Sequence, residues 1–578
     1  MKPSLPLLLL SAFLPGILAS SIVLAADTPL QTSATQKVSP SQKQFRTQSY
    51  IAYPPVKSTA AQLKTNSYSQ FENPTGIAFA AGETITLDVA PLQGQTLELR
   101  ITDFSTERMQ DSSYPLKSGK NTIVAKNSGH GYISYFTDKY KTSRPVTISI
   151  AGGTVNGYFD SSRHTNRDWK NLLASATSPI LDIRGKYVQL AYPVAALREQ
   201  CPGDGLGLIG IYDRIISIQQ EIMGLDKYKC RPKNHMFGRV IWKGFMHADG
   251  YGAAFHNNTM KNLANIAAIK KDPWGIAHEF GHVNQVRPGM KWAGTGETTN
   301  NIYSIWTKYL FSPEYINLEH HKKDDTFGNR VEGGRFNAYL NSAVIAGEPW
   351  IALKGPDKMK DYERGNGDHF VKLCPLWQLM LYFQVAGKGN PDFLPDIFQK
   401  VRQTDESGIS HGQLHTNFLK NLCDATRQNL TGFFKASGML TPIDRNIRDY
   451  GDYQLTITQK DCDDVVAYAS KYPQPESPVI HYMTSGSVKA YKEKLPVSGQ
   501  YEQGITAGEG NLNISADAWK NVTVFETYKG DKLERISILY TGSPDKTYTI
   551  VPYPEGSTRI EAVSWDGKRT LVYGTRSV

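Results

Sequence analysis

Cysteine and long apolar runs are both scarce in this chain of 578 residues. Its five cysteines are too few for the disulfide scaffold of a small secreted domain, and they are too scattered to form a thiolate metal site. Cys201 and Cys230 flank one helical pattern and are the best candidates for a disulfide pair. After residue 25, no stretch approaches the roughly 18 apolar residues that a membrane helix needs. The sequence therefore predicts no stable insertion into a membrane.

Clusters of basic residues are also missing, although the formal net charge is +10. Lysine and arginine are spread along the chain, and charged residues make up 20% of the sequence, which is typical of a solvated protein surface. No nucleic-acid-binding motif is present, so no nucleic-acid partner is predicted. The basic balance would favour encounter with acidic glycoproteins such as mucins, but net charge says nothing about the chemistry.

The N-terminus has the pattern of a secretory signal peptide. Lys2 provides a basic start, an apolar run follows, and the segment 23–25 ends in a small residue suited to cleavage. An uncleaved membrane anchor is the alternative, but Pro6 and Pro15 interrupt the apolar segment and no stop-transfer pattern follows. The sequence therefore predicts removal of residues 1–25 and export to a secreted, periplasmic or cell-surface location.

The sharpest motif is the pentapeptide H-E-F-G-H at residues 278–282. His278 and His282 are four residues apart, so both imidazoles project from one face of a helix and are spaced to bind a single metal ion. Two ordinary histidines on a helix are the alternative. The small Gly281 permits close packing and Pro288 begins a turn that ends the helix, which favours the metal site.

Two acidic residues complete the predicted site. A catalytic zinc takes three protein ligands, and Glu297 is the next acidic residue after the motif, so it is the predicted third ligand. These three ligands predict one Zn²⁺ per chain. Glu279 lies one position round the helix from the histidines and is predicted to be the general base that takes a proton from the attacking water.

These residues carry a resemblance to a known family. The run W-G-I-A-H-E-F-G-H, the glutamate fifteen positions after its last histidine, and the following E-T-T-N-N-I-Y-S resemble the enhancin-like zinc metallopeptidases, number sixty among the metallopeptidase families. The resemblance extends from about Gly152 to about Asp444. It implies a gluzincin fold, a single zinc ion, and cleavage of mucins or other O-glycosylated proteins.

Hydrophobic patterns divide the rest of the chain into four parts. Residues 26–69 are polar with little periodicity and are predicted to be a linker. Short alternating runs between turns predict β-sandwiches at residues 70–155 and 475–578. The zinc peptidase domain is placed at residues 156–474. The predicted fold class is α+β, with a domain that by resemblance is thermolysin-like (gluzincin) between the two β-sandwich domains.

Five further residues are candidates for contact with the substrate. Trp274 stands four residues before the first histidine and is predicted to stack on a sugar, with packing at the start of the helix as the alternative. Asn300 and Asn301 follow the third ligand and are predicted to orient the ligands or to bind substrate. Tyr303 and His369 are candidates for the oxyanion donor.

Together these features predict a secreted zinc metalloendopeptidase that hydrolyses peptide bonds in mucins or other O-glycosylated proteins. Two alternatives stay open, namely a glycan-independent secreted metalloprotease and a glycan-binding adhesin on a peptidase-like fold. The complete ligand set and Glu279 favour an enzyme over an adhesin. The sequence does not separate a glycan-dependent enzyme from a glycan-independent one, because glycan contacts lie on loops without a motif.

Overall fold

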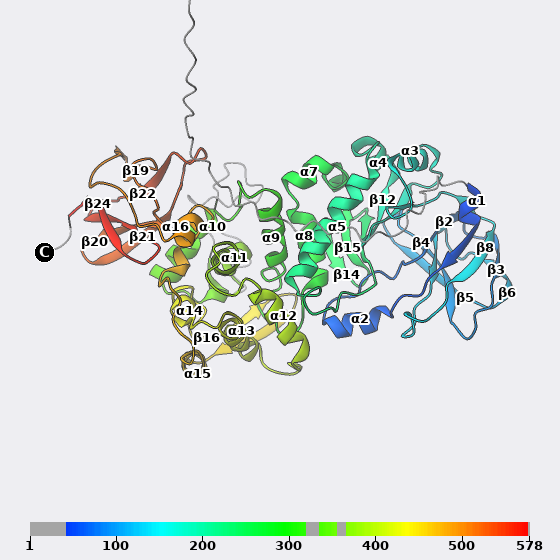
Figure 1. Cartoon of the computed structure of the whole chain (residues 1–578), viewed down its shortest axis with the longest axis horizontal. Helices are drawn as coiled ribbons and strands as arrows, with labels where there is room; N and C mark the ends of the chain where they lie inside the picture. The colour runs from blue at the N-terminus through cyan, green and yellow to red at the C-terminus, as the bar shows by residue number, and fades with distance from the viewer. Residues whose placement is uncertain (1–41, 320–333, 355–365, 576–578) are drawn as a thin grey trace, which may run out of the picture. The chain divides into compact units, whose positions relative to one another are not determined.

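The computed structural model describes residues 42–319, 334–354 and 366–575. The fold class is mixed α+β, with strands at both ends of the described chain and most helices between them (Figure 1). Within these ranges, no helix combines the length and the apolar character needed to cross a membrane. The predicted signal peptide and the first part of the predicted linker lie outside the described residues.

Two antiparallel sheets form the region before residue 156, in the strand orders β1-β8-β3-β6 and β5-β4-β7-β2-β9. Side chains alternate between the two faces of a strand, so Leu87 and Ile148 of the first sheet share a core with Leu99, Ile101 and Ile133 of the second. The elements are α1 (Gln42–Arg46), β1 (Thr47–Tyr50), α2 (Val56–Leu63), β2 (Pro74–Phe79), β3 (Thr84–Val89), β4 (Leu97–Asp103), β5 (Gln110–Leu116), β6 (Gly119–Val124), β7 (Gly129–Ser134), β8 (Val146–Ala151) and β9 (Thr154–Val155).

The linker prediction is wrong for residues 42–69. β1 pairs with β8 at the edge of the first sheet, and the segment after α2 contacts the end of the helix that carries the motif. The backbone N–H of Asn66 donates to the carbonyl of Val283 at 2.9 Å, and the hydroxyl of Tyr68 donates to Oδ1 of Asn284 at 2.7 Å. The buried apolar side chains of this segment fall in separate short elements, so they produce no periodic pattern in the sequence.

A sheet of six strands begins the central region, in the order β10-β11-β12-β13-β15-β14. Helix α8 packs against β14, β15 and α5, which places the motif beside the last strand of this order (Figure 1). The elements are β10 (Phe159–Asp160), α3 (Asn166–Ser175), β11 (Ile180–Arg184), β12 (Val188–Pro193), α4 (Val194–Gln200), α5 (Gly205–Ile222), β13 (Met236–Ile241), β14 (Met246–Asp249), β15 (Gly252–His256), η1 (Asn257–Thr259), α6 (Met260–Leu263), α7 (Ile266–Lys271), α8 (Trp274–Asn284) and α9 (Asn301–Phe311).

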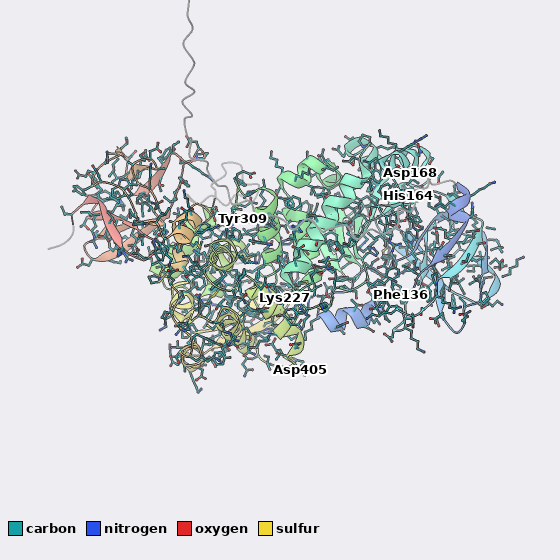
Figure 2. The ribbon with its side chains drawn as sticks, in the orientation of Figure 1. Phe136, His164, Asp168, Lys227, Tyr309 and Asp405 are labelled. Carbon is teal, nitrogen blue, oxygen red and sulfur yellow. The ribbon has the colours of Figure 1, made fainter. Side chains whose placement is uncertain are left out.

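Helices dominate the second half of the central region. Lys227, which follows α5 and is labelled in Figure 2, forms ion pairs with Asp392 and Asp396 at the start of α12. These ion pairs join the two halves of the central region. The elements are α10 (Gly334–Leu340), η2 (Asn341–Ile345), η3 (Trp350–Ala352), α11 (His369–Met380), η4 (Leu381–Val385), α12 (Phe393–Gln403), α13 (His411–Thr426), α14 (Thr431–Ala436), β16 (Ile443–Arg448), β17 (Asp452–Ile457), α15 (Gln459–Ala469), η5 (Ile480–Tyr482) and α16 (Val488–Glu493).

The last strands form two further sheets, in the orders β18-β19-β22 and β21-β20-β23-β24. They enclose a separate core that includes Trp519, Phe525 and Val551. By contrast, Ile480 and Tyr491 belong to the large core cluster that runs through the central region and also includes Val524 of β20 and Ile536 of β21. The elements are β18 (Ile505–Gly508), β19 (Asn511–Ser515), β20 (Val524–Lys529), β21 (Lys532–Ile538), β22 (Tyr548–Pro552), β23 (Arg559–Val563) and β24 (Arg569–Gly574).

All five cysteines are free thiols, so the predicted disulfide between Cys201 and Cys230 is wrong. Cys201 lies before α5, where its sulfur is 3.2 Å from the carbonyl oxygen of Asp204, whereas Cys230 follows the far end of the helix. The 18 residues of α5 span about 27 Å. A disulfide needs Cα atoms within about 7 Å of each other. The helix between the two cysteines therefore keeps them apart.

Candidate metal centre

Helices α8 and α9 approach each other closely at the motif. α8 carries His278, Glu279 and His282, and the loop before α9 carries Glu297. A Cβ atom at Gly281 would lie 2.7 Å from the backbone oxygen of Asn300, so any larger residue would push α9 away from α8. The expectation that Gly281 permits close packing is confirmed.

The imidazoles of His278 and His282 and the carboxylate of Glu297 face one another. The two Nε2 atoms are 3.2 Å apart, and Oε2 of Glu297 lies 3.2 Å from each of them. A tetrahedral zinc ion with ligand bonds of about 2.0–2.1 Å separates its ligand atoms by about 3.3–3.4 Å. The three distances between these two nitrogens and one oxygen are therefore close to the distances between ligand atoms around a tetrahedral zinc ion.

Glu279 also places a carboxylate oxygen within 4.8 Å of the histidine nitrogens, so the site offers two carboxylates for one ligand position. Glu297 fits that position better, because its Oε2 contacts both imidazoles. Burial favours its neutral acid, but the hydrogen bonds with His278 and His282 outweigh burial and hold the pKa of Glu297 well below its usual range. Glu297 is therefore ionised at neutral pH and can bind a cation.

Glu279 has the properties of a proton-transfer group. It is buried, and its Oε2 has no hydrogen-bond partner among the described residues. Burial raises the pKa of Glu279 to about 7, with the charge of Glu297 acting in the same direction and that of His278 against it. A carboxyl group that titrates near neutral pH can both accept and release a proton there.

Asn301 fixes the orientation of His278. Its Nδ2 donates to the backbone carbonyl of Glu297 at 2.8 Å, and its Oδ1 lies 2.9 Å from Nδ1 of His278. Because a carbonyl oxygen only accepts, the amide must turn its nitrogen to Glu297 and its oxygen to the imidazole. Nδ1 of His278 therefore carries the hydrogen, and the lone pair of Nε2 is left to face a metal.

Asn300 contacts the same imidazoles. Its Nδ2 lies 3.0 Å from Nε2 of His282 and 3.3 Å from Nδ1 of His278. Asn300 and Asn301 are both fully buried, so neither is exposed to a substrate. Their burial argues against the prediction that they bind substrate, and the contacts of Asn301 agree with the alternative that these residues orient the ligands.

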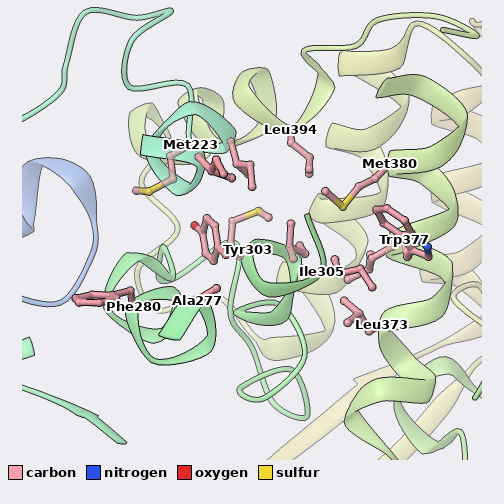
Figure 3. Packing of buried hydrophobic residues seen from close by; sticks show 14 of the residues in the cluster. Met223, Ala277, Phe280, Tyr303, Ile305, Leu373, Trp377, Met380 and Leu394 are labelled. Atoms are coloured by element: carbon pink, nitrogen blue, oxygen red, sulfur yellow. The ribbon is translucent and has the colours of Figure 1, made fainter. Parts of the chain in front are cut away.

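Tyr303 belongs to the hydrophobic core. Its ring lies among buried apolar side chains, which include Ala277 (Figure 3), and stands 6.0 Å from the ring of Phe398. Its hydroxyl donates to the backbone oxygen of Asn284 at 3.0 Å, and burial raises the pKa of Tyr303 well above its usual value. The prediction of Tyr303 as an oxyanion donor is therefore wrong, because its hydrogen is already used inside the core.

Trp274 and His369 lie at the starts of two helices. Trp274 is the first residue of α8 and is half-buried, with an edge contact between its ring and that of Phe370 at a centroid distance of 5.7 Å. His369 is the first residue of α11 and precedes Phe370. The edge contact agrees with the packing alternative for Trp274, yet part of the side chain stays accessible. Substrate contact by Trp274 and oxyanion stabilisation by His369 stay predictions.

Sequence analysis missed two residues that reach the site from a distant part of the chain. Tyr450 donates a hydrogen bond to Oε1 of Glu297, 153 residues away, and Asp449 accepts from the backbone N–H groups of Gly294 and Gly296. Both residues lie between β16 and β17, where the sequence D-Y-G-D is typical of a turn. Turn chemistry predicts a bend but not its partner, so the sequence holds no signal for this contact.

Two family models match the chain. Peptidase M60, enhancin and enhancin-like, matches residues 152–438, and the N-terminal domain of M60-like peptidases matches residues 53–149. The first match includes the motif and Glu297, and the second covers most of the two sheets before residue 156. Asp449 and Tyr450 lie outside both matches.

Solved structures of metallopeptidases are similar to this fold. A metallopeptidase in complex with Tn antigen and a metallopeptidase from Bacteroides thetaiotaomicron are each 26% identical with a TM-score of 0.71, over 92% of this chain and 99% and 90% of theirs. The M60 catalytic domain of ZmpC from Clostridium perfringens, in complex with the sialyl T antigen, is 15% identical with a TM-score of 0.65, over 91% of this chain and 100% of its own. The last likeness concerns the fold alone.

Relatives by sequence include TRPM8 channel-associated factors. Factor 3 of Rattus norvegicus is 23% identical over 327 residues, which are 56% of this chain and 32% of that protein, and factor 2 of Homo sapiens is 24% identical over 308 residues, which are 53% and 30%. The chain thus spans about a third of the length of these relatives. With the family match across the motif and the metallopeptidase structures on nearly the whole chain, the protein belongs to the M60 family of enhancin and enhancin-like metallopeptidases.

Proposed function

We propose that this protein is an exported zinc metalloendopeptidase that hydrolyses peptide bonds in O-glycosylated proteins such as mucins. The observation that carries the proposal is the meeting of His278, His282 and Glu297 at edges of 3.2 Å beside a buried Glu279. The likeness to a metallopeptidase in complex with Tn antigen supports the substrate class, because that antigen is an O-linked glycan.

Three side chains would hold the metal in a thermolysin-like (gluzincin) arrangement. His278 and His282 would bind through Nε2 and Glu297 through Oε2, with Asn301 keeping His278 in the required tautomer. Zinc bound there would supply a Lewis acid that polarises the peptide carbonyl and makes water more acidic. A carboxylate with a low pKa and the nitrogens of two imidazoles would form the donor set that zinc prefers.

Glu279 would perform the proton transfers. It would take a proton from the attacking water and deliver that proton to the nitrogen of the departing amine. A pKa of about 7 suits both steps, because the group is neither a strong acid nor a strong base at neutral pH. Its burial also limits competing contacts with bulk water.

Strand β14 offers a place for the substrate backbone. It is the last strand of its sheet and packs against α8. His247 on this strand is 48% exposed and lies close enough to Glu279 for its charge to influence that carboxyl group. Extended peptides commonly bind by pairing with the edge of a sheet. A peptide paired with β14 would therefore run past Glu279.

The substrate class is tested with two peptides of the same sequence, one bearing a single O-linked sugar on Ser or Thr and one bare. The glycopeptide should be cut beside the modified residue. The bare peptide should be cut up to ~10⁴-fold more slowly, because polar groups built to bind sugar hydroxyls lose their partners when the sugar is missing. Mass spectrometry of the products measures both rates and the position of cleavage.

Other outcomes select the alternatives. Equal cleavage of both peptides would indicate a glycan-independent protease. Binding of the glycopeptide without cleavage, at full zinc occupancy, would indicate an adhesin on a peptidase fold. Trp274→Ala should weaken cleavage of the glycopeptide only, and Trp274→Phe, which keeps an aromatic ring, is the matched control.

Export is tested at the N-terminus of the protein recovered from outside the cytoplasm. We expect a chain that begins after residue 25, as measured by intact mass and N-terminal sequencing. Recovery of the full chain in a membrane fraction would favour the anchor alternative.

A further inference from the structure

The tip of the β16–β17 hairpin meets the loop that carries Glu297. β16 and β17 pair with each other in a two-stranded antiparallel sheet, and Asp449 and Tyr450 lie in the turn between them. The backbone N–H of Asp449 donates to the carbonyl of Gly451 at 2.8 Å, which closes the turn. The turn is therefore a small, self-contained structure that presents two side chains to the metal centre.

Asp449 holds the backbone just before Glu297. Its Oδ2 accepts from the N–H groups of Gly294 at 3.0 Å and Gly296 at 2.9 Å, and the residue is buried. A Cβ atom at Gly296 would lie 2.5 Å from Oδ1 of Asp449, so glycine is needed for this contact. A buried carboxylate that accepts two backbone hydrogen bonds restrains the path of the chain over these residues.

Tyr450 contacts Glu297 directly. Its side chain is 78% exposed and its φ is +59°, a left-handed conformation that is unfavourable for a residue with a Cβ atom. Burial in the core therefore does not explain its position. Its hydroxyl donates to Oε1 of Glu297, and the ammonium of Lys291 lies 5.4 Å from the centre of its ring. The conformation is held by contacts with the metal-centre loop.

The two oxygens of Glu297 thus have separate partners. Oε2 faces both imidazoles, and Oε1 accepts from Tyr450. We propose that Tyr450 is a positioning residue that restricts Glu297 to binding a metal through Oε2 alone, and that Asp449 holds the loop so that this oxygen meets the histidines. The proposal rests on the proposed function, because it assumes that these three side chains bind zinc.

This restriction has a chemical purpose. A carboxylate whose two oxygens are equally free can bind a metal through both, which uses an additional position around the ion. A catalytic zinc site must keep a position open for water or substrate. A hydrogen bond to the second oxygen of a carboxylate ligand favours binding through one oxygen, and such outer partners strongly affect metal affinity.

The test compares the full-length protein with Tyr450→Phe and with Tyr453→Phe. Tyr453 is a matched control, because it lies on the same hairpin with its ring against His411, 4.9 Å away. Each protein is stripped of metal and titrated with Zn²⁺ against a chromogenic chelator. We expect Tyr450→Phe to bind zinc roughly 10- to 100-fold more weakly and Tyr453→Phe to bind like the wild type. Asp449→Asn should also weaken binding.

Cobalt substitution reports the coordination itself. With Co²⁺ in place of zinc, four-coordinate ions absorb visible light more strongly than five-coordinate ions. Tyr450→Phe frees Oε1 of Glu297, so its visible band should weaken relative to the wild type, while that of Tyr453→Phe should not change. A general loss of structure would lower the melting temperature as well, whereas the exposed Tyr450 should be replaced without such a change.

The outcomes separate this proposal from the proposed function. Wild-type zinc affinity and an unchanged cobalt band in Tyr450→Phe would overturn the positioning role while leaving the zinc ligands intact. A wild-type protein that binds no zinc would overturn both. Loss of affinity in Tyr450→Phe, together with a wild-type protein that cuts no glycopeptide, would support the positioning role and refute the substrate class.

Discussion

Helix α8 and the β16–β17 turn hold the same carboxylate by different means. α8 brings two imidazoles to Oε2 of Glu297, and the turn brings a hydroxyl to Oε1 from 153 residues away. The helix is defined by a five-residue pattern, whereas the turn acts through tertiary contacts that no local pattern describes. The difference teaches that the reactive groups of this site are encoded locally and their alignment is encoded at a distance.

The largest effect is expected on the helix side. His278→Ala should remove most of the bound zinc and with it the cleavage of peptides, because two ligands do not hold a catalytic zinc. Metal analysis after dialysis measures occupancy, and circular dichroism checks the fold. Zinc at full occupancy in both His278→Ala and His282→Ala would contradict the role given to α8 in this comparison, since α8 would then not supply the ligands.

A second change on α8 separates chemistry from binding. Glu279→Gln keeps the shape of the side chain but cannot take a proton, so turnover should fall roughly 10²-fold or more while zinc occupancy stays unchanged. Steady-state cleavage and metal analysis of the same sample provide the two measurements. Near wild-type turnover would show that another group is the base.

The approach of α8 to α9 is tested at Gly281. Ala at this position places a Cβ atom 2.7 Å from the backbone oxygen of Asn300, and the overpacking should cost about 1–3 kcal/mol of the free energy of unfolding. Gly210 in α5 is the matched control, because a Cβ atom there would have no neighbour within 4 Å. Gly210→Ala should stabilise the helix by about 0.5–1 kcal/mol. Denaturant unfolding measures both.

The smallest effect is expected at Tyr303. Tyr303→Phe removes the hydrogen bond to the backbone of Asn284 and should cost about 0.5–1.5 kcal/mol of stability, with kcat/KM unchanged. A loss of kcat at constant zinc occupancy would restore Tyr303 as an oxyanion donor. The variant thus tests whether Tyr303 takes part in the chemistry or only packs in the core.

Local patterns predicted much of this protein. The spacing of His278 and His282 predicted the shared helical face, and the apolar period after Glu297 agrees with α9. The alternating runs after residue 70 agree with the strands of the two N-terminal sheets. In each case the signal comes from residues close together in sequence, where helix or strand geometry alone decides which side chains share a face.

The failures involve contacts between distant segments. Tyr303 follows Glu297 by less than two helical turns, but its ring packs near Phe398 of α12 and its hydroxyl donates to the backbone oxygen of Asn284 at the end of α8. The polar segment 42–69 resembles a linker in the sequence, but in the structure its backbone pairs with β8 and contacts the end of α8. Tyr450 lies in a turn that meets the Glu297 loop only because the whole central region packs together. Such contacts depend on the assembled fold, so a single sequence does not reveal them.

The contacts that hold the motif in place also set a lower limit on the length of a fragment in which the site stays aligned. Residues 152–438 contain every side chain assigned to chemistry, yet a fragment cut at those borders would lose the hydrogen bond from Asn66 to the end of α8 and the contact of Tyr450 with Glu297. Such a fragment would keep the side chains of the metal centre but would lose the contacts that align them. The unit that aligns the site therefore runs at least from the segment after α2 to β17, beyond both borders of the peptidase match at residues 152–438.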